Sequence, residues 1–167
     1  MTLFQQKINF SQLITGLVIL FSGALVYIVD RPPEQTLFVN NGILKISLYQ
    51  TLPNLFGTLG NSLPDFTHVF AFIMITAGLI SCSSKGYILI STLWFITDSL
   101  FEIGQKFSTT ATELIPGWFH SIPFLKNTPF FFQTGTFDWL DLAAILTGSV
   151  SAYLTIHIMA QKEKPLK

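Results

Sequence analysis

Two acids and an amide lie on the last turns of a strongly apolar segment of this sequence. The stretch FITDSLFEIGQKF, residues 95–107, follows the run GYILISTLWFI and carries Asp98, Glu102 and Gln105. At about 100° per helical residue, these three side chains fall on one side, and Trp94 lies on that side one turn earlier. An ionised carboxylate within an apolar span is costly unless it is paired or hydrated. This stripe is therefore a candidate functional site.

Two more pairs of polar residues begin apolar segments. Asp65 and His68 are three residues apart, and so are Asp138 and Asp141, so each pair shares one face of a helix. Capping and the helix macrodipole favour acids at a helix N-terminus, which alone could explain the three aspartates without any function. The macrodipole disfavours acids near a helix C-terminus, where the first stretch has them. Taken together, the polar residues favour a functional site over capping alone.

Carboxylates with one imidazole suggest either metal binding or proton chemistry. Such a set suits Mg²⁺, Ca²⁺ or Mn²⁺, and His with Glu and Asp could also hold Zn²⁺, although no HExxH motif is present. The candidate ligands of a divalent metal ion are Asp65, His68, Glu102, Asp138 and Asp141. Without a metal, crowded carboxylates would share protons, and Asp98 and Glu102 are the candidate catalytic acids or bases. Gln105 and Trp94 would line the same site.

The composition predicts a membrane protein. Half of the 167 residues are hydrophobic, only 11% are charged, and the mean hydropathy is +0.54, whereas a soluble domain carries about a quarter charged residues. The net charge is zero and no nucleic-acid-binding motif occurs, so no nucleic-acid partner is expected. The single cysteine, Cys82, excludes an intrachain disulfide and a multi-cysteine metal site.

Four segments are long and apolar enough to cross a hydrocarbon core of about 30 Å, which takes about 20 helical residues. We therefore expect an all-α membrane protein that forms a single transmembrane domain over residues 1–167. The first segment is interpreted as an uncleaved span, because its apolar run is longer than that of a signal peptide. The four predicted spans cover about residues 11–29, 65–82, 86–105 and 138–160.

The connections between these spans differ in length and character. Spans two and three are joined by the tight turn SSK, whereas residues 30–64 form a long loop after the first span. Within that loop, residues 42–60 contain Pro53, Gly57 and Gly60, so an interfacial or re-entrant segment is expected rather than a span. Residues 106–137 are rich in aromatic residues and proline, and we expect them to lie on the bilayer surface and cover the site.

The positive charges indicate an orientation. The side of both termini carries Lys7, Lys85, Lys162, Lys164 and Lys167, while the other side has Arg31, Lys45, Lys106 and Lys126 spread through longer loops. Cytoplasmic loops carry an excess of Lys and Arg, so both termini are expected in the cytoplasm. The starts of spans two and four and the end of span three then share the extracytoplasmic side, which brings the three polar stretches together there.

The three polar stretches resemble the motifs of a known family. In order and spacing, DFTHVFAF, FEIGQ and GTFDWLDLAAILTGS resemble the VanZ-like family of small bacterial membrane proteins, over roughly residues 65–153. The matching residues are Asp65 and His68, then Glu102 and Gln105, then Asp138, Asp141 and Gly148. The resemblance implies a setting in the bacterial inner membrane and cell envelope, and a link to glycopeptide (teicoplanin) resistance.

The sequence departs from this family's pattern at two positions. Thr136 follows Gly135 where the family often has Arg, and Ile145 lies four residues after the second Asp, where the family often has Asn. An Arg at the first position could pair with the acids or hold an anionic group. Its absence argues against a phosphate-binding site.

Three functions remain open at this point. The first is a cell-envelope protein whose extracytoplasmic acidic site binds or modifies a lipid-linked or cell-wall component, with or without enzymatic turnover. The second is a structural or scaffold subunit, in which the polar stretches hold the helices together. The third is a small proton- or cation-coupled transporter, which with four spans would need a homo-oligomer or a membrane complex. We rank them in that order.

Overall fold

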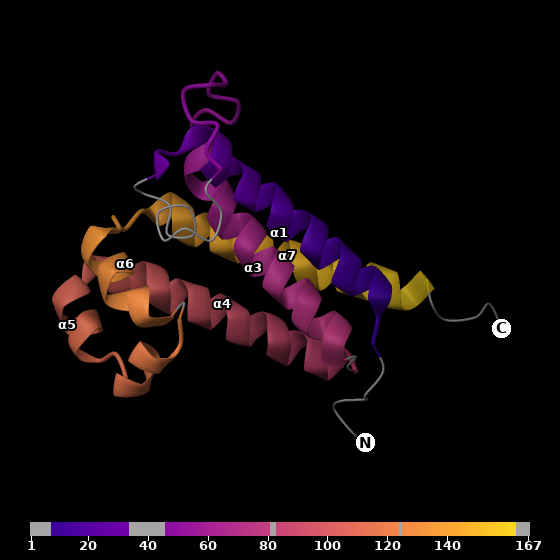
Figure 1. The fold of residues 1–167 in the computed structure, drawn as a ribbon. Helices are drawn as coiled ribbons and strands as arrows, with labels where there is room; N and C mark the ends of the chain where they lie inside the picture. Colours follow the sequence, from indigo (N-terminus) through magenta and orange to yellow (C-terminus); the bar gives the residue numbers. More distant parts are fainter. Residues whose placement is uncertain (1–7, 34–45, 81–82, 124, 163–167) are drawn as a thin grey trace.

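Four long helices form the protein. The computed structural model describes residues 8–33, 46–80, 83–123 and 125–162, and these residues form helices and loops but no strand. The long helices, which run in alternating directions in Figure 1, are α1 (Phe10–Asp30), α3 (Leu59–Ile80), α4 (Ser84–Lys106) and α7 (Trp139–Lys162). Each is long and apolar enough to cross a membrane. The predicted all-α architecture with four candidate spans is confirmed.

Short helices connect α4 to α7. They are α5 (Ser108–Glu113), two 3-10 helices (Gly117–Ser121 and Leu125–Asn127) and α6 (Thr128–Thr134). All lie at the end of the bundle where α4 ends and α7 begins (Figure 1). Here α6 packs onto α4, with the Phe132 ring beside Gly104 at a place where a Cβ would meet it at 2.6 Å. Phe101 of α4 contacts the same ring, at 5.5 Å between ring centroids.

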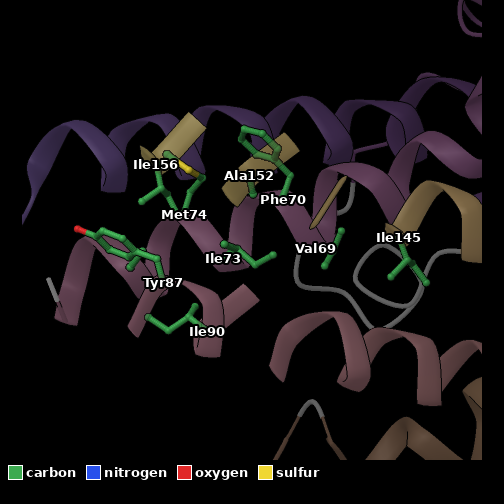
Figure 2. Packing of buried hydrophobic residues seen from close by; sticks show 10 residues of the cluster. Val69, Phe70, Ile73, Met74, Tyr87, Ile90, Ile145, Ala152 and Ile156 are labelled. Atoms are coloured by element: carbon green, nitrogen blue, oxygen red, sulfur yellow. The ribbon is translucent and has the colours of Figure 1, made fainter. Parts of the chain in front are cut away.

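Helix α3 lies at the centre of the bundle and supplies most of the buried apolar core. The cluster in Figure 2 combines Val69, Phe70, Ile73 and Met74 of α3 with Tyr87 and Ile90 of α4 and Ile145, Ala152 and Ile156 of α7. Because lipid tails are as apolar as these side chains, helix association in a bilayer depends on close packing rather than on the hydrophobic effect. The interdigitated core of α3 provides that packing.

The outward faces of the long helices are apolar as well. Exposed side chains recur every three or four residues, for example Phe10, Ile14, Val18, Phe21 and Leu25 on α1, and Leu146, Val150, Leu154 and Ile158 on α7. Facing water, such continuous apolar stripes would be an aggregation hazard. Facing lipid, they are the expected surface of a membrane-spanning helix, so these stripes support a bilayer environment.

Small residues let the helices approach one another closely. A Cβ at Gly78 of α3 would lie 2.8 Å from the backbone nitrogen of Leu13 and 3.0 Å from the carbonyl oxygen of Asn9. The backbone N–H of Asn9 in turn donates to the Gly78 carbonyl at 2.7 Å. On α7, a Cβ at Gly148 would lie 2.7 Å from the carbonyl oxygen of Phe66. The small residues of α7 therefore serve helix packing.

Replacing Gly78 with valine is expected to lower the midpoint of thermal unfolding, at a cost of about 1–3 kcal/mol, because the neighbouring atoms belong to a backbone that cannot rotate away. The measurement is thermal unfolding of the purified protein in detergent. Gly117 is a matched control, since a Cβ there would meet nothing within 4 Å. Equal midpoints for Gly78→Val and Gly117→Val would contradict the close packing of α1 on α3.

The second span begins earlier than the sequence predicts. We expected it to start at Asp65, directly after Pro64, but α3 already begins at Leu59. Pro64 has no N–H to donate to the carbonyl of Gly60, four residues earlier. The guanidinium of Arg31 donates to that carbonyl instead, at 3.4 Å, and to the carbonyl of Asn61 at 2.7 Å. A contact from α1 thus satisfies the carbonyl that the proline leaves without a partner.

The described part of the first long loop, residues 46–58, consists of turns and bends. The carboxylate of Asp30 accepts the backbone N–H groups of Leu55 at 3.1 Å and Phe56 at 2.8 Å, which ties the loop to the end of α1. An open depression of about 270 Å³ lies beside Asp30 and Tyr49. The remainder of the segment expected to be interfacial or re-entrant, residues 42–45, lies outside the described residues, as does Cys82.

Candidate functional site

Glu102 joins the polar stretch of α4 to the polar stretch that begins α7. Its side chain, near the end of α4, is only 3% exposed. Oε2 accepts a hydrogen bond from the Gln105 amide at 2.7 Å, and Oε1 accepts the backbone N–H of Asp138 at 2.8 Å. Both carboxylate oxygens are therefore engaged, one within α4 and the other at the start of α7. The pairing of Glu102 with Gln105 follows from their spacing of three residues on one helix.

Asp138 acts as the cap of α7. Its Oδ1 accepts the backbone N–H of Leu140 at 2.9 Å, and its side chain is exposed. An aspartate that accepts an N–H of the first helical turn stabilises the helix N-terminus in the usual way. The capping explanation that the sequence allowed for Asp138 therefore applies to its carboxylate, while its backbone N–H binds Glu102.

Asp65 and Asp141 come together from α3 and α7, and they are close enough to repel each other electrostatically. The side chain of Ser62, on α3, lies beside the Asp141 carboxylate. One oxygen of that carboxylate, Oδ1, is buried and has no hydrogen-bond partner in the described part of the chain. Because α3 begins at Leu59, Asp65 lies beyond the first turn, where neither a cap nor the macrodipole stabilises an acid. Capping therefore cannot explain Asp65.

The cation near these acids is Arg31, which sequence reasoning assigned to a loop and gave no partner. Its charge is close enough to attract both Asp65 and Asp141. The guanidinium also lies 4.9 Å from the centre of the Tyr27 ring. One signal could have identified it: Arg31 is the only arginine of the chain and directly follows the first apolar span. We call Asp65, Glu102, Asp138, Asp141 and Arg31 the acidic cluster.

His68 pairs with an acid outside this cluster. Its Nδ1 lies 3.1 Å from Oδ2 of Asp98, so α3 and α4 are linked by an imidazole–carboxylate pair. The His68 side chain is 51% exposed and that of Asp98 is 11% exposed. Trp94 does not reach the cluster either: its Nε1 donates to Thr76 at 3.0 Å and its ring stacks on Phe72. The one-sided stripe predicted for α4 therefore divides between two neighbouring sites.

The predicted metal ligands do not form one ligand set. In the described part of the chain, no three His, Cys, Asp or Glu side chains are arranged to hold a metal ion. The geometry gives the reason: His68 is paired with Asp98, and the carboxylate of Asp138 caps α7. The arrangement suits hydrogen-bond recognition and proton transfer better than metal coordination.

Comparisons with known families, with curated proteins and with solved structures find no match to this chain. The functional inference therefore rests on the site itself. The acidic cluster combines four carboxylates with one guanidinium at one end of the bundle. Asp98 lies one helical turn before Glu102 on α4. It pairs with the imidazole of His68, which is half exposed at the protein surface.

Proposed function

We propose that this chain is a VanZ-like protein of the bacterial inner membrane, whose acidic cluster faces the extracytoplasmic side and binds or modifies a lipid-linked or cell-wall component. The observation that carries the proposal is the meeting of the three motif stretches. Glu102 accepts the N–H of Asp138, and Asp65 lies within electrostatic reach of both Glu102 and Asp141. The resemblance relates these residues by sequence order alone, and their proximity in space supports it.

The charge balance of the cluster favours ligand binding over a purely structural role. Buried polar atoms in a structural network are normally hydrogen-bonded. Here Oδ1 of Asp141 is buried without a partner in the described residues, and Arg31, which attracts both Asp65 and Asp141, is outnumbered by the four carboxylates. A ligand that donates N–H or O–H hydrogen bonds would satisfy the free oxygen and offset the excess negative charge.

The proposed function is tested by glycopeptide resistance. Expressing the chain in a teicoplanin-susceptible bacterium is expected to raise the minimal inhibitory concentration of teicoplanin, and Asp141→Asn is expected to abolish the increase at equal protein level in the membrane. Glu113→Gln is the control, because this acid is exposed on α5. A resistance gain that survives Asp141→Asn, or no gain from the native chain, would refute the proposal.

The proposed orientation has its own measurement. With both termini in the cytoplasm, the segment between α4 and α7 lies outside the cell. In a Cys82→Ser background, a cysteine in place of the exposed Lys126 is expected to react with a membrane-impermeant maleimide added to intact cells. Labelling that occurs only after cell lysis would mean that the orientation is the opposite one and that the acidic cluster is in contact with the cytoplasm.

A scaffold role is the second candidate, and the fully engaged carboxylate of Glu102 favours it. In that case the cluster fastens α4 to α7 and binds no ligand. Glu102→Gln and Asp141→Asn would then lower the thermal midpoint and leave teicoplanin susceptibility unchanged wherever the protein still accumulates. The two candidate functions therefore predict opposite outcomes for Asp141→Asn in cells.

A further inference from the structure

The imidazole of His68 has one ring nitrogen, Nε2, that no described residue binds. Nδ1 of His68 lies 3.1 Å from Oδ2 of Asp98. An ionised carboxylate only accepts hydrogen bonds, so when Asp98 is ionised Nδ1 carries the hydrogen and donates it. The neutral ring then has its lone pair on Nε2. No hydrogen bond to Nε2 is found in the described part of the chain, and half of the side chain is exposed. In that state Asp98 fixes both the tautomer and the direction of the ring.

The pair lies well inside the helices. His68 is nine residues from the start of α3, or about 13 Å along the axis at 1.5 Å per residue. Asp98 is eight residues from the end of α4, or about 12 Å. In helices that span a bilayer, these positions lie within the hydrocarbon region, where a charge is costly unless a polar group stabilises it, as the His68 N–H does for Asp98. A ligand that reaches Nε2 from the lipid side must therefore be uncharged where it meets the protein.

The immediate surroundings of the pair are aromatic. The Phe72 ring meets the His68 ring edge-on at 4.4 Å between centroids and stacks on Trp94 at 4.7 Å. The one polar group of that tryptophan is occupied, because its Nε1 donates to Thr76. Helices α3 and α4 diverge from their short connection toward the other end of the bundle (Figure 1). The site thus offers one outward acceptor above an apolar aromatic wall.

We propose that Nε2 of His68 accepts a hydrogen bond from the hydroxyl of a neutral lipid alcohol, of the diacylglycerol or polyprenol class, whose chain packs along Phe72 and Trp94. Such a molecule is uncharged and partitions into the bilayer. Its single hydroxyl can donate one hydrogen bond to Nε2. This inference rests on the proposed function and names its substrate class. His68 and Asp98 are each about one helical turn from an acid of the cluster, Asp65 and Glu102, so a lipid bound here has its hydroxyl beside the cluster.

The test is nitrogen-15 NMR of the protein labelled at its histidines and held in phosphatidylcholine nanodiscs. It measures the resonances of the imidazole nitrogens. Dioleoylglycerol is expected to shift the Nε2 resonance of His68, whereas trioleoylglycerol, which has no hydroxyl, is expected to leave it in place. His157 is the internal control: it is exposed on α7 and stacks on Tyr153, but has no carboxylate partner among the described residues. No shift with dioleoylglycerol, or an equal shift with trioleoylglycerol, would overturn the proposal.

Adding glycerol to the buffer distinguishes a lipid alcohol from a soluble polyol as the source of the hydroxyl. Glycerol carries the same group without the chains, and is expected to cause no shift. An equal shift with glycerol would mean that the site takes a soluble polyol, which would refute the lipid. Because resistance is measured with Asp141→Asn in cells, a failure of the lipid-alcohol proposal is distinguishable from a failure of the proposed function.

Two substitutions isolate the pair. His68→Phe keeps an aromatic ring and removes the acceptor, and is expected to weaken dioleoylglycerol binding about three- to tenfold, the contribution of one hydrogen bond. His157→Phe is expected to leave binding unchanged. In Asp98→Asn the amide can donate to Nδ1, which would move the hydrogen to Nε2 and reverse the tautomer seen in the spectrum. Native binding by His68→Phe, or an unchanged tautomer in Asp98→Asn, would refute the assigned role of the pair.

Discussion

Replacing Glu102 with leucine is expected to cost about 2–5 kcal/mol of stability, because two hydrogen bonds to a buried carboxylate are lost. The Asp138 N–H and the Gln105 amide would both lose their acceptor. The leucine would fill the space but leave the start of α7 unfastened from the end of α4. The midpoint of thermal unfolding in detergent measures the effect.

Exchanging the acid of Glu102 with the amide of Gln105 tests their hydrogen bond more specifically than Glu102→Leu does. Glu102→Gln keeps one acceptor for the Asp138 N–H but turns an amide toward the amide of Gln105, so about half of the loss is expected. Adding Gln105→Glu restores a carboxylate–amide pair and is expected to recover part of it. The exposed acid Glu113 is the control, and Glu113→Gln is expected to leave the midpoint unchanged. A native midpoint in Glu102→Leu would show that the carboxylate does not fasten the helices.

The sequence was sufficient for the features that depend on one helix at a time. Length and apolar content predict the four long helices, because crossing a bilayer sets a minimum run of apolar residues. The Glu102–Gln105 bond follows from spacing within a single helix. The capping role of Asp138 was likewise open to prediction, since it needs only an aspartate before a helix.

The start of α3 could not be predicted in the same way. Pro64 is a strong signal for a helix boundary, yet the helix continues through it from Leu59. The Gly60 carbonyl that Pro64 leaves without an intrahelical donor is satisfied by Arg31, 29 residues earlier in the chain. A local pattern contains no information about such a distant donor.

The division of the polar residues between two sites depends on how the helices are oriented. Asp65 and His68 share a helix face, as predicted, but residues three apart still differ by about 60° around the axis. Because α3 packs against both α4 and α7, that difference is enough for Asp65 to approach Asp141 while His68 pairs with Asp98. Helical periodicity identifies the face, and only the packing of α3 identifies the neighbour of each side chain.

Arg31→Met is expected to destabilise the protein by about 2–4 kcal/mol, because it leaves neighbouring acids without this cation and the Gly60 carbonyl without a donor. The guanidinium donates to Gly60 and Asn61 and attracts Asp65 and Asp141. Thermal unfolding in detergent measures the loss. Lys126→Met is the control: it removes an exposed cation from the connection between α4 and α7 and is expected to leave the thermal midpoint unchanged.

A double-mutant cycle separates the charge of Arg31 from its hydrogen bonds. In the native background Asp65 is attracted by Arg31 and repelled by Asp141 and Glu102, so Asp65→Asn changes several interactions that partly cancel. In the Arg31→Met background no arginine opposes the repulsion by Asp141 and Glu102, and Asp65→Asn is expected to be stabilising there, with a coupling of about 1 kcal/mol or more. Arg31→Lys keeps the charge but loses the planar fork that reaches two carbonyls, so an intermediate loss is expected. Additive effects of Arg31→Met and Asp65→Asn would mean that Arg31 stabilises the start of α3 through its backbone contacts alone, and that the acidic cluster has no internal counterion.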